Sequence, residues 1–122
     1  MSDETDIKAL QMAYAARTDA RDAEGFADLF TDDGELVLPG GFRIAGREKL
    51  LKAVRNMPPG GRHLPQPGAI LINGDRAQAT SRFRFLPEQG AEMTGGYEDL
   101  FLKTARGWRF TYRLNRVDEP SD

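Results

Sequence analysis

The sequence predicts an α+β fold: a curved, mostly antiparallel β-sheet wrapped around a long N-terminal helix with two further helices, forming a cone with an open pocket. Two observations support this prediction. Apolar residues recur at helical spacing in the first half of the 122 residues, whereas the second half shows strand-like segments separated by turn signals. No linker or repeat divides the chain, so we expect one domain over residues 1–122, with a polar tail from about Asp118.

Three helices are predicted, at residues 3–21, 23–30 and 47–57. In the first helix, Ile7, Leu10 and Tyr14 lie three and four residues apart, which places them on one helical face. Asp22 is expected to cap the second helix, and residues 31–34, with the sequence TDDG, are expected to form a turn. The Pro-Pro-Gly-Gly run that follows the third helix ends it.

Strands are predicted in the remainder of the chain, at residues 35–38, 42–45, 62–64, 69–72, 76–86, 93–104 and 108–117. Pro65 and Pro67 indicate an edge strand or a bent start, because proline cannot donate a hydrogen bond within a sheet. The Asn-Gly-Asp sequence after residue 72 is a strong hairpin signal. Along residues 76–86 the side chains alternate, so Phe83 and Phe85 share one face of their strand.

Composition excludes several classes of protein and site. The chain has no cysteine, which rules out disulfides and thiolate metal sites, and with a single histidine we expect no zinc site. The net charge is -2, with acids and bases mixed along the chain, so no nucleic-acid footprint is visible. No apolar run reaches the roughly 18 residues of a membrane span, and the acidic N-terminus shows no secretion signal. We therefore expect a cytoplasmic protein that binds neither nucleic acid nor membrane.

An acid and the single histidine are the candidate catalytic residues. Asp19 lies near the end of the first helix, where the helix dipole disfavours an acid, so its placement calls for a partner. His63 precedes an apolar strand, and an imidazole paired with a carboxylate is a competent general base near neutral pH. The alternatives are a solvated acid and a structural or surface histidine. The sequence predicts a catalytic pair if the two side chains meet in one pocket.

Four further residues are candidate substrate-binding residues: Tyr14, Phe85, Tyr97 and Asp99. Tyr14 belongs to the apolar stripe of the first helix, and its alternative role is a core aromatic with a hydrogen-bonded hydroxyl. Tyr97 and Asp99 are two residues apart and share one face of their strand. The alternative for Asp99 is an ion pair with a neighbouring arginine, for which the candidates are Arg82, Arg84, Arg109 and Arg113.

Successive blocks of the sequence resemble the SnoaL-like family, part of the wider cystatin-like cone superfamily related to nuclear transport factor 2. The blocks are YAARTDARDAEGFADLFTDDGEL, GREKL, GGRHL, INGDRAQATSRF and GGYEDLFLKTARGWRF, and they occur in order between Ile7 and about Arg116. The resemblance implies the cone fold. One fold hosts many chemistries, and members include dehydratases, a dehydrochlorinase, ketosteroid isomerase, epoxide hydrolases, polyketide cyclases and non-catalytic binding modules.

The dehydratase and dehydrochlorinase branch is similar to this chain at two positions. Its aspartate at the end of the first helix matches Asp19, and its histidine at the start of a sheet strand matches His63. In that branch the aspartate orients and charges the histidine, which removes a proton from carbon. Two departures are visible: the dehydratase has a second active-site histidine that is missing here, and Leu38 occupies the position of the isomerase base. Tyr14 matches the oxyanion tyrosine of the isomerase.

These features favour a lyase- or cyclase-type enzyme that acts on a small, largely apolar or cyclic substrate and needs no cofactor or metal. In this hypothesis His63 is the general base, Asp19 orients its imidazole, and a tyrosine hydroxyl polarises a substrate oxygen. A non-catalytic binding module is one alternative. An isomerase-like enzyme is another, as is an epoxide hydrolase in which Asp99 and Arg82 converge with Asp19. We expect a homodimer that forms through the outer face of the sheet.

Overall fold

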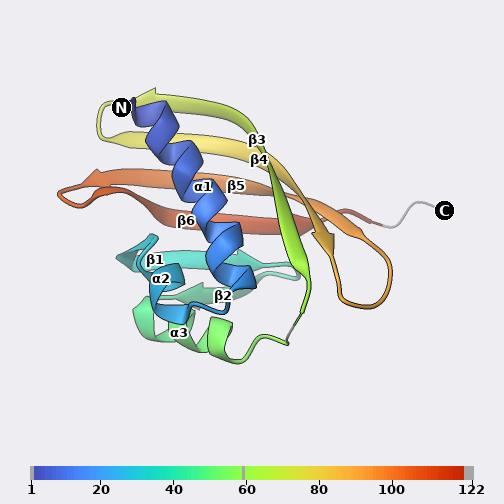
Figure 1. Ribbon diagram of the computed structural model, residues 1–122. Helices are drawn as coiled ribbons and strands as arrows, with labels where there is room; N and C mark the ends of the chain where they lie inside the picture. The colour runs from blue at the N-terminus through green and yellow to red at the C-terminus, as the bar shows by residue number, and fades with distance from the viewer. Residues whose placement is uncertain (1, 59, 120–122) are drawn as a thin grey trace.

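The computed structural model describes residues 2–58 and 60–119, and within this part of the chain the helices and strands follow a simple order (Figure 1). The elements are α1 (Asp3–Asp19), α2 (Ala23–Ala27), β1 (Phe30–Leu38), β2 (Phe42–Ala45), α3 (Arg47–Arg55), β3 (Arg62–Asn73), β4 (Arg76–Leu86), β5 (Met93–Thr104) and β6 (Gly107–Val117).

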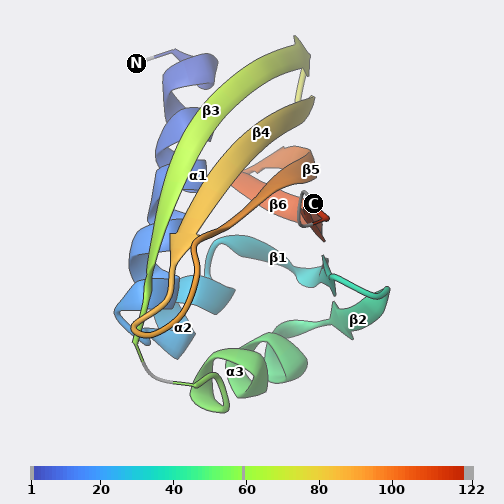
Figure 2. The same ribbon diagram turned by 90° about the vertical axis from the view of Figure 1, so that its right-hand side faces the viewer.

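The strands form a curved sheet in the order β2-β1-β6-β5-β4-β3. Neighbouring strands are antiparallel except for β1 and β6, which run parallel. The sheet curves around α1, which crosses its concave face, while α2 and α3 lie near β1 and β2 (Figure 2). The predicted α+β class, with a mostly antiparallel sheet around a long N-terminal helix, is confirmed.

α1 begins at Asp3, as predicted, but ends at Asp19 instead of Arg21. Arg21 adopts the left-handed backbone conformation, with a φ of 61°, and its N–H donates to the Thr18 carbonyl at 3.1 Å. The next N–H along the chain donates to the Arg17 carbonyl at 3.0 Å, which completes a Schellman motif. Because a left-handed residue cannot continue a right-handed helix, the chain turns here, and Asp19 is the last helical residue.

The second helix and the segment after it differ from the prediction. Asp22 caps α2 through its carboxylate, as expected, but α2 ends at Ala27. The turn predicted at residues 31–34 is wrong, because these residues belong to β1, which starts at Phe30. The pairing between β1 and β6 shifts register between Phe30 and Glu35. The turn-forming residues therefore make an irregularity inside a strand, since pairing of Phe30 with β6 extends the strand beyond the local signal.

β3 is a continuous edge strand, although the sequence predicted two short segments at residues 62–64 and 69–72. It runs from Arg62 to Asn73, and its register with β4 shifts between Pro67 and Ile70. In the described sheet β3 pairs only with β4, so the edge position, one of the two alternatives that the prolines indicated, is confirmed.

The predicted polar tail is anchored where it begins. The Asp118 carboxylate accepts a hydrogen bond from the Thr94 hydroxyl at 2.8 Å and pairs with Arg82. The Asp118 N–H donates to the Thr94 carbonyl at 2.9 Å. Residues 120–122, which the tail prediction also covers, lie outside the described residues.

Aromatic side chains fill the space between α1 and the sheet. The Tyr14 ring of α1 lies 5.1 Å from Phe26, 5.6 Å from Tyr97 and 6.0 Å from Phe110, measured between ring centroids. None of the four is more than 5% exposed. Such tilted and edge-on contacts stabilise a core beyond the area that they bury.

A buried ion pair lies inside this aromatic core. Arg113 of β6 donates from Nε to Oδ1 of Asp99 on β5 at 2.8 Å, and from Nη2 to Oδ2 at 3.4 Å. Gln11 of α1 donates to the same carboxylate at 3.3 Å. The guanidinium carbon lies 3.5 Å from the Tyr97 centroid and 4.2 Å from the Tyr14 centroid. Burial raises the pKa of Asp99, and Arg113 and Gln11 oppose that rise. Asp99 therefore forms an ion pair with Arg113, which is the alternative role that the sequence analysis gave it.

Replacing Arg113 with Met should lower the free energy of unfolding by about 3–5 kcal/mol, because the Asp99 carboxylate would stay buried without its cation. Chemical denaturation by urea measures the loss. Arg116→Met is the matched control, since Arg116 also lies on β6 and pairs with an acid of β5, Glu98. Those two side chains are 69% and 53% exposed, so their separation should change stability little. Equal losses in the two variants would contradict a special role for the buried pair.

Candidate active site at the end of α1

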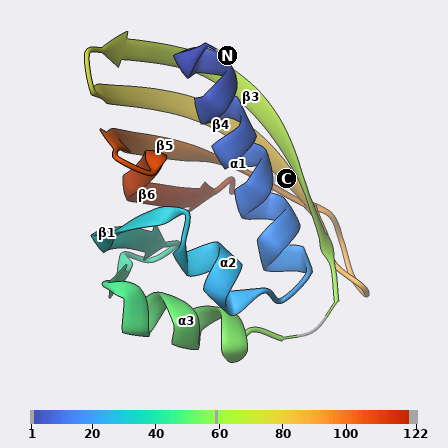
Figure 3. The same cartoon turned by 60° about the vertical axis from the view of Figure 1, so that its left-hand side comes forward.

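The end of α1, the start of β3 and the loop between β4 and β5 lie at the same end of the fold (Figure 3). Residues of these segments line a pocket of about 530 Å³. Its polar wall includes Thr18, Asp19, Arg21 and His63, and its apolar wall includes Met57, Pro58, Phe85 and Pro87. Gly60, Glu88 and Gln89 complete the lining. The pocket brings residues from both halves of the chain together at one end of the cone.

Asp19 and His63 contact each other at this pocket. The Asp19 carboxylate accepts a hydrogen bond from the His63 backbone N–H through Oδ2 at 2.8 Å, and it bonds Nδ1 of the imidazole through Oδ1 at 2.6 Å. Both side chains are about one-fifth exposed. The carboxylate at the disfavoured end of α1 thus has two partners, which offset the unfavourable helix dipole.

This geometry determines the tautomer of the neutral imidazole. A carboxylate is a hydrogen-bond acceptor, so Nδ1 must carry the proton and Nε2 must hold a free lone pair. Among the described residues Nε2 has no hydrogen-bond partner, and it is not among the buried polar atoms that lack one, so solvent or a ligand can reach it. His63 therefore presents a basic nitrogen whose other ring nitrogen is oriented by an acid.

Two glycines position His63. Gly60 and Gly61 both have a φ of 91°, a backbone conformation that favours glycine, and they turn the chain from α3 into β3. A Cβ added at Gly61 would lie 2.5 Å from Cζ of Phe85, so the backbone passes close to that ring. His63 is the register partner of Phe85, and the two rings lie 4.6 Å apart between centroids. The Phe85 ring packs against the imidazole at an interplanar angle of 45°.

The six residues singled out in the sequence fall into two groups. Asp19, His63 and Phe85 line the pocket together. Tyr14, Tyr97 and Asp99 do not line it, because they surround the buried Arg113 guanidinium instead.

The two core tyrosines are weak acids in this structure. Burial raises the pKa of Tyr14 to about 12, and it also raises the pKa of Tyr97. The negative charges of Asp99 and, for Tyr97, of Asp19 act in the same direction, whereas the Arg113 cation opposes them. Both hydroxyls therefore remain protonated at neutral pH.

Sequence reasoning did not identify Arg21, Met57 and Glu88 as pocket residues. Met57 is the last residue of the third helix as predicted from the sequence, and Glu88 lies in a loop with no distinguishing pattern. For Arg21, the position two residues after Asp19 was the one available signal. Their convergence depends on how two loops and a helix end pack, which spacing along the chain does not encode.

The described residues contain neither a candidate metal site nor a membrane-spanning helix. Within residues 2–58 and 60–119, no group of three or more histidine, cysteine, aspartate or glutamate side chains is placed to hold a metal ion. In the same residues, no helix is both long and apolar enough to cross a membrane.

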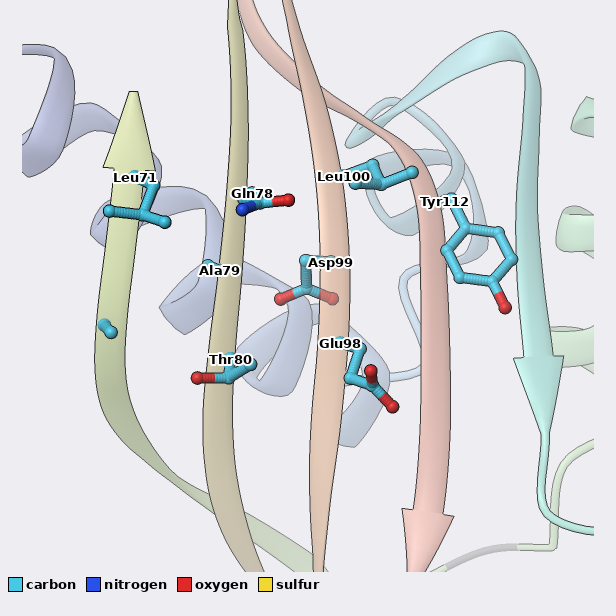
Figure 4. Close-up of a pocket in the computed structure, with 9 residues that line it drawn as sticks. Leu71, Gln78, Ala79, Thr80, Glu98, Asp99, Leu100 and Tyr112 are labelled. Atoms are coloured by element: carbon cyan, nitrogen blue, oxygen red, sulfur yellow. The ribbon is translucent and has the colours of Figure 1, made fainter. Parts of the chain in front are cut away.

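A second hollow, of about 340 Å³, lies on the outer face of the sheet, away from α1 (Figure 4). Leu71, Gln78, Leu100 and Tyr112 border it from four strands. Leu71 is 64% exposed and Leu100 is 47% exposed. The side chain of Asp99, which the hollow also touches, is fully buried on the opposite face, so the ion pair and this hollow are separate features.

The sequence matches the SnoaL-like domain over residues 1–114, which is nearly the whole chain. The chain belongs to the SnoaL-like family. No curated protein sequence matches it significantly. The resemblance drawn from the sequence blocks is thus confirmed at the level of the family.

Solved structures place this SnoaL-like chain in the cystatin-like fold. A protein of unknown function from Mycobacterium tuberculosis is 28% identical, with 95% of this chain and 72% of that one covered and a TM-score of 0.86. A nuclear transport factor 2-like protein with a cystatin-like fold from Novosphingobium aromaticivorans is 24% identical, with coverage of 98% and 84% and a TM-score of 0.88. A scytalone dehydratase candidate from the same species is 21% identical, with coverage of 98% and 86% and a TM-score of 0.81.

The Asp19–His63 contact predicts a specific NMR signature. In the neutral imidazole the proton should reside on Nδ1, because the carboxylate holds it there. Nitrogen-15 shifts of the ring, correlated with its carbon-bound protons, distinguish the tautomers, and the single histidine makes the assignment unambiguous. Asp19→Ala should move the proton toward Nε2, the tautomer that free histidine prefers. An Nε2-protonated ring in the unmodified protein would contradict the contact.

Proposed function

We propose that this SnoaL-like protein is a lyase- or cyclase-type enzyme that uses Asp19 and His63 to remove a proton from a carbon atom of a small cyclic molecule. One observation supports this most directly: a single carboxylate binds both the backbone N–H and Nδ1 of His63, which leaves Nε2 free as a base at a pocket. Proton abstraction of this kind needs no cofactor.

The proposed step begins with the transfer of a proton from a substrate C–H bond to His63. Nε2 of His63 accepts the proton, and the C–H electron pair either forms a carbon–carbon double bond as a leaving group departs with its own pair, or attacks a carbonyl carbon in a ring closure. The imidazolium that forms is stabilised by the Asp19 carboxylate 2.6 Å from Nδ1. It then returns its proton to the leaving group or to the new oxygen. A positioned base of this kind contributes about 10²–10⁴-fold to the rate.

The apolar wall of the pocket suits the ring of a cyclic substrate. Met57, Pro58, Phe85 and Pro87 offer carbon-rich surface beside the polar pair. For Tyr14, Tyr97 and Asp99 we propose a supporting role: they hold the Arg113 cluster that fixes α1 against the sheet.

The alternatives differ in how well the contacts support them. The epoxide-hydrolase arrangement requires Asp99, Arg82 and Asp19 to converge, yet Asp99 is buried against Arg113 while Arg82 pairs with Asp118. A non-catalytic binding module fits the same pocket and is consistent with the absence of a second histidine. Turnover separates the module from the enzyme.

His63→Gln should reduce turnover at least 10²-fold because it removes the base. The fold should stay intact, because the backbone N–H of residue 63 keeps its hydrogen bond to Asp19. The assay incubates the protein in D₂O with cyclic ketones, alcohols and halides that carry an acidic C–H, and proton NMR follows elimination and deuterium incorporation. Asp19→Asn should also lower the rate, since it removes the charge that stabilises the imidazolium. Exposed Glu24 on α2 supplies the control, Glu24→Gln. Unchanged turnover in His63→Gln would remove the assignment, and ligand binding without turnover would favour the module.

We also propose that the chain forms a homodimer through the outer face of the sheet. Leu71, which is 64% exposed, and Leu100, which is 47% exposed, border the hollow on that face. Large apolar side chains left exposed beside one hollow support a protein–protein contact there.

Leu100→Glu should convert the dimer into a monomer in sedimentation velocity experiments, because a charge would be buried at the contact. Met12→Glu is the matched control: Met12 is also 47% exposed but lies on α1, away from the outer face. Sedimentation of the unmodified chain as a monomer at every concentration would rule out this dimer.

A further inference from the structure

Arg21 combines an unusual backbone conformation with a place on the wall of the Asp19–His63 pocket. It is the one non-glycine residue with a positive φ in the described residues, at 61°. Its position, immediately after the helix cap of a Schellman motif, is usually occupied by glycine, since any Cβ there is crowded by the backbone. Residues kept in such conformations cluster at functional sites. A long cationic side chain at this position therefore calls for an explanation.

The charge of Arg21 is not neutralised within the described structure. No acidic side chain of residues 2–58 and 60–119 forms a salt bridge with it. Within the described residues, the guanidinium makes one hydrogen bond, and it is long: Nη1 donates to the Val54 carbonyl at 3.4 Å. The nearby Asp19 carboxylate is engaged by His63. A guanidinium has five N–H donors, so most of its hydrogen-bonding capacity is available to a ligand in the pocket.

We infer that Arg21 binds a carboxylate of the substrate, so that the pocket selects cyclic carboxylates. The planar fork of a guanidinium matches the two oxygens of a carboxylate. A dianionic phosphate would suit the pocket less well, because Asp19 and Glu88 also line it and a single cation faces them. A carboxylate held at Arg21 anchors one end of the ring, while the remainder lies along Phe85 toward the imidazole.

This inference rests on the proposed function for its catalytic meaning, but binding can be tested without turnover. The alternative is structural: through Val54, the Arg21 guanidinium interacts with the C-terminal end of α3, where helix carbonyls favour a cation. The two roles predict opposite behaviour for a glycine substitution. Glycine accepts a φ of 61° readily, so Arg21→Gly removes the cation and relieves the backbone at the same time.

The test compares 2-naphthoate with its neutral amide, 2-naphthamide, by isothermal titration calorimetry. The unmodified protein should bind 2-naphthoate at least 10-fold more tightly than the amide, and added salt should reduce that preference. Arg21→Gly should abolish the preference while keeping or raising the melting temperature. Arg21→Lys should retain part of it. Arg55→Gln, which removes an exposed cation of α3 that does not line the pocket, should leave it unchanged.

Two results would overturn the inference. One is equal affinity for the two probes, or no binding of 2-naphthoate, in the unmodified protein. The other is a preference that survives in Arg21→Gly; if the melting temperature also falls, Arg21 serves α3 alone. His63→Gln separates this inference from the proposed chemistry, because it should abolish turnover yet keep the preference for 2-naphthoate. If the catalytic proposal fails, the carboxylate site is therefore still tested by the binding measurement alone.

Discussion

The candidate site depends on one carboxylate that makes two hydrogen bonds across the fold. Asp19 ends α1, and His63 lies near the start of β3, 44 residues later in the chain. By accepting from both the backbone N–H and the ring Nδ1–H of His63, the carboxylate fixes the strand and the imidazole relative to the helix. The same contact therefore serves the architecture, the tautomer and the reactivity of Nε2.

The interior of the cone and the pocket at its end have different roles. Inside, the Arg113–Asp99 pair is enclosed by the rings of Tyr14 and Tyr97, and these groups join α1 to the central strands. These groups are buried and engaged with one another, so a ligand could enter the interior only by displacing them. The pocket forms instead where loops meet the end of the helix, and there a base and a cation face solvent without disturbing the core.

The end of α1 concentrates chemistry because the helix stops there in a specific way. The Schellman motif makes Asp19 the last helical residue and places Arg21 in a left-handed conformation. A carboxylate and a guanidinium two residues apart would diverge on a regular helix. The turn lets both side chains line one pocket. There the Asp19 carboxylate is hydrogen-bonded to His63, while the Arg21 guanidinium can bind a ligand. Strain in the backbone and an unpaired charge occur at the same residue, which is the pattern expected where function outweighs local stability.

Much of this protein was determined by its sequence alone. Helical spacing in α1, the hairpin signal before β4 and the alternation along it predicted the α+β cone, because these patterns record which face of each element is buried. The single histidine and Asp19 were also visible as candidates. The tertiary structure decided the rest. Residues 31–34 joined a strand because pairing with β6 outweighed a local turn signal, and Asp99 found Arg113 among four possible arginines. Arg21 lines the pocket together with residues from distant segments of the chain, and spacing along a chain cannot encode contacts that only packing creates.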